Sequence, residues 1–285
     1  MIQSMTGYGK AEVEIPQKKV TVEIKTLNSK NLDLNVRVPS FYREKELEIR
    51  SKLSKQLVRG KIDFSIFIES TGSETTTIIN KDVVNNYIDQ LRAIAVTPPE
   101  STLEIAMRLP DALKTEREQL NEDQWTEIEK TIDEAIVKVM KFRTDEGNVL
   151  KQDFTNRIQT IQQLSVDVAN LDEERLINVR ERLRKAILEL KQTVDENRFE
   201  QELVYYLEKL DITEEKVRLS NHLDYFLQEL KSEVSNGKKL GFISQEIGRE
   251  INTTGSKSNF APMQKVVVQM KDELEKIKEQ LLNVL

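Results

Sequence analysis

The apolar residues of this chain change their spacing near residue 80, and this change limits the folds open to it. Before that point they alternate with polar residues in KKVTVEIKT, NLDLNVRV and KIDFSIFIE, as in strands with one buried face. From about Asn80 onward they recur every three or four residues, as in amphipathic helices. The pattern predicts an α+β fold with a small antiparallel sheet at the N-terminus and a long helical part at the C-terminus.

The segments between the three predicted strands indicate how they connect. The link LNSKN between the first two strands is short enough for a hairpin. Between the second and third strands, Ile49, Leu53 and Leu57 recur every four residues, and Gly60 follows as a candidate C-cap. We therefore expect one helix packed on the sheet.

Helical spacing divides the remainder of the chain. A helix near residues 81 to 95 is expected to end before Thr97-Pro98-Pro99, because the residue before a proline disfavours the helical conformation. Apolar spacing predicts long exposed helices from roughly Asp145 to Val194. We accordingly expect an α+β domain over residues 1–150, connecting helices over 151–200 and a helical domain over 201–285. The sequence leaves open whether Trp125 lies in a core or at an interface.

The last helix carries an apolar seam with alternating spacings of four and three residues. Its members are Met263, Val267, Met270, Leu274, Ile277, Leu281 and Val284. Three heptads are near the minimum for a coiled coil. Packing within the chain and contact between subunits are both compatible with the seam, and we expect it to contribute contacts to an oligomeric ring or cage.

Composition excludes several kinds of site. The chain has no cysteine and a single histidine, His222, which excludes disulfides, thiol nucleophiles and, within one chain, metal sites built from several imidazoles. Chemistry must then use carboxylates, hydroxyls, lysine, arginine and a bound cation. No apolar run approaches the roughly 20 residues that span a bilayer. We therefore expect a soluble cytoplasmic protein without a membrane partner.

Charge is unevenly distributed along the chain. The total of 43 basic and 49 acidic residues gives −6, but residues 1–70 hold 13 basic and 9 acidic residues, a difference of +4. Residues 71–236 sum to −12 and residues 237–285 to +2. Within residues 37–61, Lys45, Lys52, Lys55 and Arg59 fall broadly on one side of the predicted helix, where a phosphate backbone could lie. A solvated helix face is the alternative interpretation.

The segment QEIGREINTTGSKS has the spacing of a cation site. Glu246 and Glu250 are four residues apart, so a helix would present both carboxylates to Mg²⁺ or Mn²⁺. Arg249 could neutralise them instead, as on a salt-linked surface helix. Asn252 to Ser258 are predicted to form a polar turn that could hold a phosphate with backbone and hydroxyl donors. A simple helix connection is the alternative.

A second polar group lies upstream in DITEEKVRLSNH. Asp211, Glu214, Glu215, Arg218 and His222 fall within about three helical turns, and the last three of them lie near one face. A lone histidine on a helix is more often a packed or surface residue than a ligand.

Five strings, in order, resemble the YicC-like family of bacterial endoribonucleases. They are MIQSMTGYG, VEIKTLNSKNLDLNVRVPS, the RGK before the third strand, the DITEE run and QEIGREINTTGSKS. The resemblance implies a divalent-metal-dependent endoribonuclease that prefers single-stranded RNA, assembles as a hexamer and acts in small-RNA or mRNA turnover.

The resemblance, together with the spacing of the polar residues, suggests roles for particular residues. Catalytic roles are expected for Glu246, Glu250, Arg249, Lys257 and His222. Binding of Mn²⁺ or Mg²⁺ is expected at Glu246, Glu250, Glu214, Glu215 and Asp211. RNA binding is expected at Lys30, Arg37, Arg59, Lys61, Asn252, Ser256 and Ser258.

This sequence also departs from the family pattern. Gly241 stands where the family often has aspartate, and Gly248 stands where asparagine is common. The loss of a carboxylate at Gly241 favours a second hypothesis, an oligomeric RNA-binding or adaptor protein without hydrolytic activity. A purely structural scaffold is a third, which leaves the NTTGSKS segment without a role.

Overall fold

The computed structural model describes all residues except 1, 72–76, 97, 116–121 and 190–195. The N-terminal part contains β1 (Gly7–Ile15), β2 (Lys18–Leu27), β3 (Leu32–Arg37), a 3₁₀ helix (Ser40–Lys45), α1 (Glu46–Leu57) and β4 (Gly60–Ser70). A small module follows with β5 (Thr77–Ile79), α2 (Lys81–Ile94), α3 (Pro99–Arg108) and β6 (Leu113–Thr115). The helical part contains α4 (Glu122–Glu189), α5 (Glu196–Lys209), α6 (Thr213–Glu229), α7 (Gly237–Lys257) and α8 (Ala261–Leu281).

The α+β class is confirmed, but the sheet is mixed rather than antiparallel. Its strand order is β1-β2-β4-β3, with antiparallel pairing except between β3 and β4, which are parallel. The predicted hairpin between β2 and β3 is therefore wrong, because β4 lies between them. Parallel strands need a long crossover, which α1 supplies between β3 and β4.

Strand β1 was not among the predicted strands, and its glycines explain why. A side chain at Gly9 would place its Cβ 2.2 Å from the carbonyl oxygen of Ala135 on α4. Glycine therefore permits the close approach of α4 to the sheet while interrupting the apolar alternation that marks a strand. β1 turns into β2 at Pro16 and Gln17, and Gln17 has a φ of 64°.

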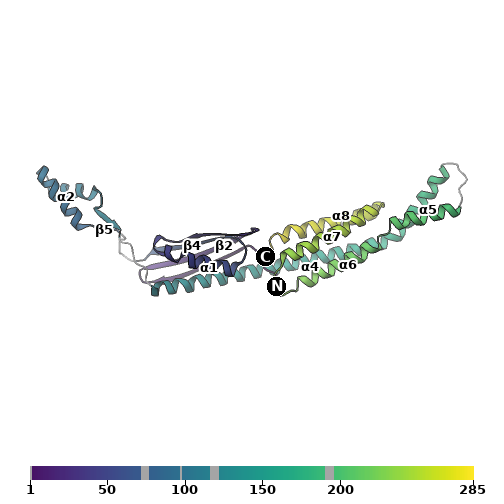
Figure 1. Ribbon diagram of the computed structural model, residues 1–285, viewed down its shortest axis with the longest axis horizontal. Helices are drawn as coiled ribbons and strands as arrows, with labels where there is room; N and C mark the ends of the chain where they lie inside the picture. The colour runs from purple at the N-terminus through teal and green to yellow at the C-terminus, as the bar shows by residue number, and fades with distance from the viewer. Residues whose placement is uncertain (1, 72–76, 97, 116–121, 190–195) are drawn as a thin grey trace.

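One face of the sheet is covered by α1 and the first half of α4 (Figure 1). Val22, Phe64, Leu53 and Ile128 are fully buried in this core. Trp125 also belongs to it, with its ring centroid 5.6 Å from that of Tyr42. The alternation thus identified the buried face of β2 and β4 correctly, whereas in β3 Leu32, expected to be buried, is 38% exposed.

A single helix, α4, joins the two large cores. Its 68 residues correspond to about 100 Å at 1.5 Å per residue. Its first half packs on the sheet, while Phe154, Ile158 and Ile161 are buried in a second core with α6, α7 and α8. The two halves of the molecule are therefore attached to one continuous rod (Figure 1).

The apolar seam of α8 is buried inside its own chain. All seven seam residues, from Met263 to Val284, belong to the helical core. α8 packs there against α4 and α7. The expectation that this seam forms subunit contacts is therefore wrong, since its side chains are already covered.

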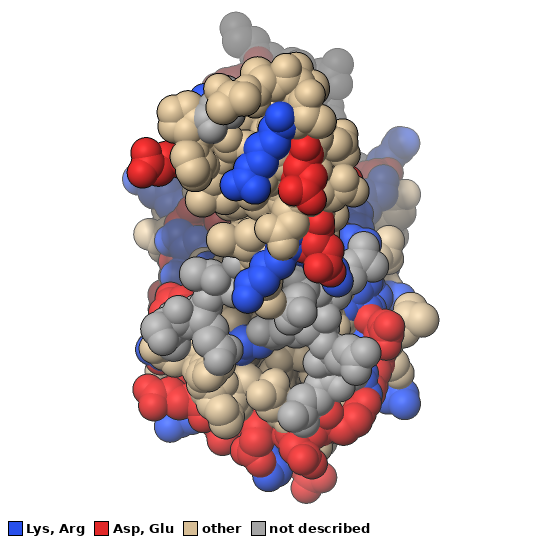
Figure 2. All heavy atoms as spheres, turned by 90° about the vertical axis from the view of Figure 1, so that its left-hand side faces the viewer, with Lys and Arg blue, Asp and Glu red and all other residues tan. Residues whose placement is uncertain are grey.

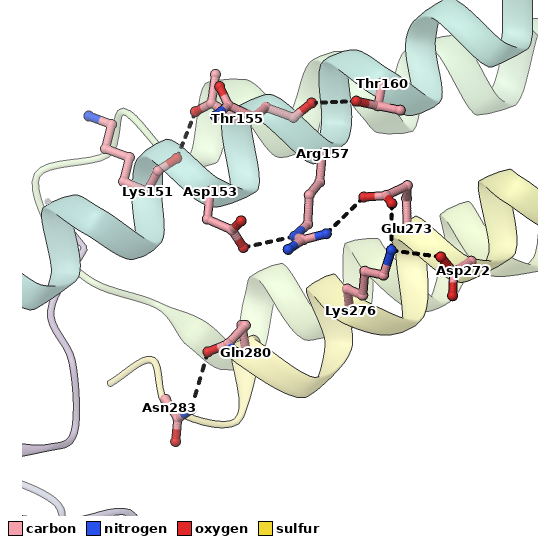
Figure 3. Close-up of polar contacts among 11 residues, drawn as sticks. Lys151, Asp153, Thr155, Arg157, Thr160, Asp272, Glu273, Lys276, Gln280 and Asn283 are labelled. Carbon is pink, nitrogen blue, oxygen red and sulfur yellow. Dashed lines mark hydrogen bonds and ion pairs between the residues drawn. The ribbon is translucent and has the colours of Figure 1, made fainter.

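Polar contacts beside the seam connect α4 to α8 (Figure 3). Arg157 binds Asp153 through Nε and Glu273 through Nη1, each at 2.8 Å. Lys276 binds Glu273 at 2.8 Å and Asp272 at 2.7 Å. Lys276 and then Arg157 lower the pKa of Glu273. These contacts fix the position of α8 along α4.

The two ends of the chain meet between the sheet and the helical part (Figure 1). Ser4 pairs with Val284 in an isolated bridge, and the Met5 N–H donates to the Asn283 carbonyl at 2.8 Å. Beneath them, Arg143 of α4 is fully buried and donates to the Thr26 hydroxyl and the Met5 carbonyl, among other oxygens. Burial lowers the pKa of Arg143 to about 10. This arginine connects α4, the sheet and the N-terminal segment.

The module formed by residues 77–115 projects beyond the sheet at one end of the molecule (Figure 1). α2 confirms the helix predicted over residues 81 to 95, whereas the short strands β5 and β6 were not predicted. Its small core consists of Val84, Ala106 and Ala112 and is separate from the two large cores.

Among the described residues, no helix combines the length and apolar character needed to cross a bilayer.

Candidate functional site

The NTTGSKS segment is helical, so the predicted phosphate-binding turn is wrong. α7 continues to Lys257, and its backbone N–H groups are used within the helix. The hydroxyl groups also bond back to the chain: Thr253 Oγ1 donates to the Arg249 carbonyl at 3.0 Å and Ser256 Oγ to the Thr253 carbonyl at 2.9 Å. Ser258 is buried and donates to the Thr254 carbonyl at 2.6 Å. The segment therefore offers no backbone cradle for an anion.

Two glycines of α7 allow close packing against α8. A Cβ at Gly248 would lie 3.2 Å from Leu274 Cδ2, and one at Gly255 would lie 3.0 Å from Val267 Cγ1. A Cβ at Gly241 would have no neighbour within 4 Å. Gly255 thus serves helix packing rather than a turn, and the position of Gly241 has room for a side chain.

The C-terminal end of α7 carries a buried ion pair with α6. Lys257 Nζ lies 2.8 Å from Glu215 Oε1 and donates to the Asp211 carbonyl at 2.8 Å. Glu215 is only 5% exposed, and its other oxygen, Oε2, has no hydrogen-bond partner among the described residues. A buried carboxylate oxygen without a partner is costly, so Glu215 is suited to accept a proton donor or a cation.

A charged group on α4 supports this ion pair and was not predicted. Arg175 is 1% exposed, binds Asp172 at 2.7 Å and donates to the Lys257 carbonyl at 3.2 Å. Lys216 of α6 binds the same Asp172 at 2.8 Å. The spacing of Asp172 and Arg175 suggests only a local helix pair, so the contact with a residue 82 positions away could not be read from it.

Glu246 and Glu250 differ strongly in their surroundings. Glu246 is bound by Arg249 at 2.7 Å on the helix surface, as the salt-linked alternative proposed. Glu250 is 9% exposed and has no hydrogen-bond or ion-pair partner within the described parts of the chain. Of the two carboxylates, Glu250 is therefore the better candidate for binding a cation.

The register of α6 against α7 sets the level of His222 relative to Glu250. The helices are antiparallel, with anchors at Lys239–Glu229, 2.6 Å apart, and at Lys257–Glu215. Between these anchors, Glu250 lies level with the turn of α6 from residue 218 to 222. His222 is half-buried and, within the described structure, has no polar partner.

The remaining predicted metal ligands are occupied. Arg218 forms an ion pair with Glu214. Asp211 Oδ1 accepts hydrogen bonds from the Thr213 hydroxyl at 2.7 Å and backbone N–H at 3.1 Å, and these bonds lower the pKa of Asp211. In the described residues of one chain, no group of three or more histidine, aspartate or glutamate side chains could hold a metal ion. The five predicted ligands are thus not brought together as one site.

Two of the four residues on the predicted basic side of α1 are neutralised by acidic residues. Lys45 binds Glu122 at 3.3 Å, and Lys52 binds Glu129 at 2.9 Å and Asp133 at 2.8 Å. These partners come from α4, about 80 residues later, so the sequence pattern could not reveal them. At Lys45 and Lys52 this side is therefore part of a helix interface rather than a phosphate track, whereas Lys55 is exposed.

Three other predicted RNA-binding residues gather at one end of the sheet. β4 begins between the end of β2 and the start of β3, with Lys61 opposite Leu27 and Gly60 opposite Leu32. The short link that carries Lys30 must therefore cross the start of β4, next to Arg59. Lys30 and Lys61 are exposed. Arg37, also exposed, lies farther along the sheet, opposite Ser65.

The backbone around Arg59 is unusual. Val58 has a φ of 55° and Gly60 a φ of 117°, and the left-handed region is unfavourable for a β-branched residue such as valine. Arg59 Nη2 contacts Met5 Sδ at 3.4 Å, and its buried Nε has no partner among the described residues. The strained turn thus holds an arginine with spare hydrogen-bonding capacity between two lysines.

Comparison with known sequences decides the family. The sequence model of the N-terminal region of YicC-like endoribonucleases matches residues 2–152, and the model of their C-terminal region matches residues 168–285. The chain belongs to the YicC-like endoribonuclease family. The resemblance noted from the five strings is thereby confirmed.

Two relatives of this family match over their full length. The probable endoribonuclease YicC of Clostridioides difficile (strain 630) is 32% identical over 293 residues, covering 100% of both chains. The probable endoribonuclease YicC of Haemophilus influenzae (strain ATCC 51907 / DSM 11121 / KW20 / Rd) is 29% identical over 287 residues, again covering 100% of both. The break between the two YicC-like regions, at residues 153–167, falls inside α4, in the stretch whose Phe154, Ile158 and Ile161 are buried in the helical core.

Proposed function

We propose that this chain is an endoribonuclease that cleaves single-stranded RNA with the help of Mn²⁺ or Mg²⁺. Family membership supports the class of reaction. The observation that carries the site is a pair of largely buried carboxylates: Glu215 on α6, whose Oε2 has no hydrogen-bond partner among the described residues, and Glu250 on α7, which is 9% exposed. Such groups lower their energy by binding a cation, which RNA cleavage can use.

The donor set fits a cation held only partly by protein. Mg²⁺ is commonly bound by one or two carboxylates and completed by water and substrate phosphates. Glu250, with Glu246 one turn away or Glu215 on α6, would supply those carboxylates in a single chain. The bound cation would neutralise charge on the phosphate and lower the pKa of the attacking hydroxyl or water.

The protein's own side chains have distinct tasks in this proposal. Lys257 keeps Glu215 in place through its ion pair. Arg249 has a 73% exposed side chain, so it can leave Glu246 and bind a non-bridging phosphate oxygen. His222, level with Glu250, is positioned to transfer a proton.

RNA would be guided by the cations at the end of the sheet. Lys30, Arg59 and Lys61 would supply positive charge at one end of the sheet. Arg37, the last residue of β3, would extend this charge along the sheet. Asn252 and Ser256, exposed on α7, would contact the strand near the carboxylates. We further propose that several copies assemble, as a hexamer, and that the physiological role is turnover of small RNA or mRNA in the cytoplasm.

Cleavage of a labelled single-stranded RNA with Mn²⁺ tests this site. Glu250→Gln and Glu246→Gln are expected to lower the rate of cleavage. The loss should be at least about 100-fold for Glu250→Gln, because this carboxylate is the proposed cation ligand. Glu275→Gln is a matched control, because Glu275 forms an exposed ion pair with Lys278 three residues on, as Glu246 does with Arg249. Undiminished cleavage by both site variants would refute the assignment.

A second candidate is an RNA-binding or adaptor protein without hydrolytic activity. It is favoured by the lack of a converging three-ligand group among the described residues and by Gly241 in place of an acidic side chain. This alternative predicts RNA binding that Mn²⁺ does not convert into cleavage. Gel-shift and cleavage assays on the same nuclease-free preparation separate the two.

A further inference from the structure

The turn that leads into β4 is strained at an exposed residue. The Arg59 N–H donates to the Leu57 carbonyl at 2.6 Å, and Val58 between them has a φ of 55° and a ψ of −55°. These angles are close to those of a γ-turn with positive φ, which is rare and strained, most of all for a β-branched residue. The Val58 side chain is 64% exposed, so core packing does not explain a valine here. Strained residues of this kind cluster at binding and active sites.

Exposed apolar side chains surround this turn. Leu27 pairs with Lys61 and Leu32 with Gly60, so the two leucines flank the start of β4 and point to opposite faces of the sheet. Leu27 is 53% exposed and Leu32 is 38% exposed. With Val58 they form an apolar rim at the end of the sheet, which we call the sheet-end patch.

Positive charge surrounds the sheet-end patch. Residues 27–33 and 55–61 contain four basic residues and one acidic residue, a difference of +3, whereas the whole chain sums to −6. Lys30, Lys55 and Lys61 are exposed, and their ammonium groups have no ion pair or hydrogen bond with another described residue. Figure 2 looks onto the end of the molecule that carries residues 77–115, where lysine and arginine instead lie beside aspartate and glutamate. The sheet-end patch is therefore suited to an anionic partner with apolar groups.

The link between β2 and β3 adds hydrogen-bonding groups to this surface. Asn28 and Asn31 lie on either side of Lys30 and are exposed. An amide side chain both donates and accepts, as the edges of unpaired bases require. A lipid surface would offer phosphates without such edges, so the two amides favour RNA as the occupant.

We propose that the sheet-end patch binds the faces of unpaired RNA bases, while the three lysines around it bind the neighbouring phosphates. This inference rests on the proposed function and adds to it the feature that selects single-stranded RNA. In a duplex the bases are stacked and paired, so the patch would find no free base face to contact. Phosphates are present in both forms of RNA and give no such selection.

RNA binding by the full-length protein tests the patch. The probes are a fluorescently labelled single-stranded RNA and the same strand annealed to its complement, both in EDTA to prevent metal-dependent cleavage. Val58→Gly removes the apolar side chain and lets the turn form without strain, whereas Leu27→Ser shortens an exposed side chain outside the turn. Leu47→Ser is the control, because Leu47 is an 80% exposed leucine about 15 Å along α1 from Leu57.

The wild type is expected to bind the single strand more tightly than the duplex. Val58→Gly and Leu27→Ser should each raise the Kd for the single strand at least about fivefold and leave the Kd for the duplex within about twofold. Leu47→Ser should change neither. Val58→Gly should also melt at the wild-type Tm or above, because the lost strain offsets the greater freedom of glycine in the unfolded chain.

Three results would overturn the proposal: no preference of the wild type for the single strand, unchanged single-strand binding by both variants, or an equal loss for the duplex. Leu27→Ser decides the binding result if Val58→Gly fails to fold. Binding to phosphatidylserine vesicles that Val58→Gly abolishes, with single-strand binding intact, would assign the patch to a membrane surface and overturn the proposal too. Selective binding without any cleavage in Mn²⁺ would refute the proposed function and leave this inference standing.

Discussion

Replacing Lys257 with methionine tests whether the buried ion pair supports the helical part. The substitution keeps much of the apolar stem but removes the ammonium group that Glu215 Oε1 binds at 2.8 Å. The side chain of Glu215 is 7% exposed and its Oε2 already has no partner among the described residues. Without Lys257, Oε1 would lose its ion pair too, and Glu215 would be left as a buried unpaired charge. Removing one partner of a buried pair costs about 3 to 5 kcal/mol.

The 30% exposure of the Lys257 side chain reduces this cost, because water screens part of the interaction. We therefore expect a loss of about 2 to 3 kcal/mol in the free energy of unfolding and a fall in Tm of about 5 to 10 °C. Urea unfolding followed by circular dichroism measures the first and thermal unfolding the second.

Glu215→Gln in the same background completes a double-mutant cycle. The double variant buries no charge at this position, so its loss should be smaller than the sum of the two single losses by about 1 to 2 kcal/mol. If Lys257→Met costs less than about 0.5 kcal/mol, or if the two losses are additive, the ion pair does not stabilise the fold as argued. Reduced RNA cleavage at unchanged stability would instead place Lys257 in the reaction alone.

Two further predictions concern helix glycines and surface charge. Gly241→Ala should raise the free energy of unfolding by about 0.5 to 1 kcal/mol, because nothing lies within 4 Å of the added Cβ. Gly248→Ala should lower it by about 1 kcal/mol, because the added Cβ would lie 3.2 Å from Leu274 Cδ2 of α8. Equal changes of the two variants in thermal unfolding would contradict this reasoning. Lys10 and Lys19 lower the pKa of Glu12 from 4.5 to about 2, so its ionised form stabilises the fold above pH 4.5 and this contribution is lost as pH falls toward 2. Replacing both lysines with glutamine should move the pKa of Glu12 back toward 4.5 in an NMR titration, and an unmoved midpoint would show that the ion pairs do not form in solution.

Local patterns in the sequence predicted the elements but not how they pair. Period-two alternation located β2, β3 and β4, and helical spacing located α1, α2 and α8. Strand order was not predictable in this way, because alternation records which face of a strand is buried and not which strand lies beside it. The insertion of β4 between β2 and β3 depends on α1 as a crossover.

The candidate site was predictable in residue type more than in geometry. The polar segment after Glu250 resembles a turn in composition, but Thr253 and Ser256 satisfy their hydroxyl groups on helix carbonyls. Gly255 is required by the approach of Val267 from a later helix. Likewise, Arg175 is far from Lys257 in sequence, and only the packed structure brings the two together.

The continuous helix α4 sets the rotational phase between the two halves of the molecule. Each residue of an α-helix turns the chain by about 100°, so one residue inserted between the sheet core and the helical core would swing one half around the other by that angle. It would also shift Gly147, where a Cβ would come within 2.1 Å of the Ile2 carbonyl oxygen. An insertion of seven residues comes close to two full turns and restores the phase to within about 20°. The same seven residues would lengthen α4 by about 10 Å and draw Ser4 away from Val284, so such an insertion restores the rotational phase but not the contact between the two chain ends.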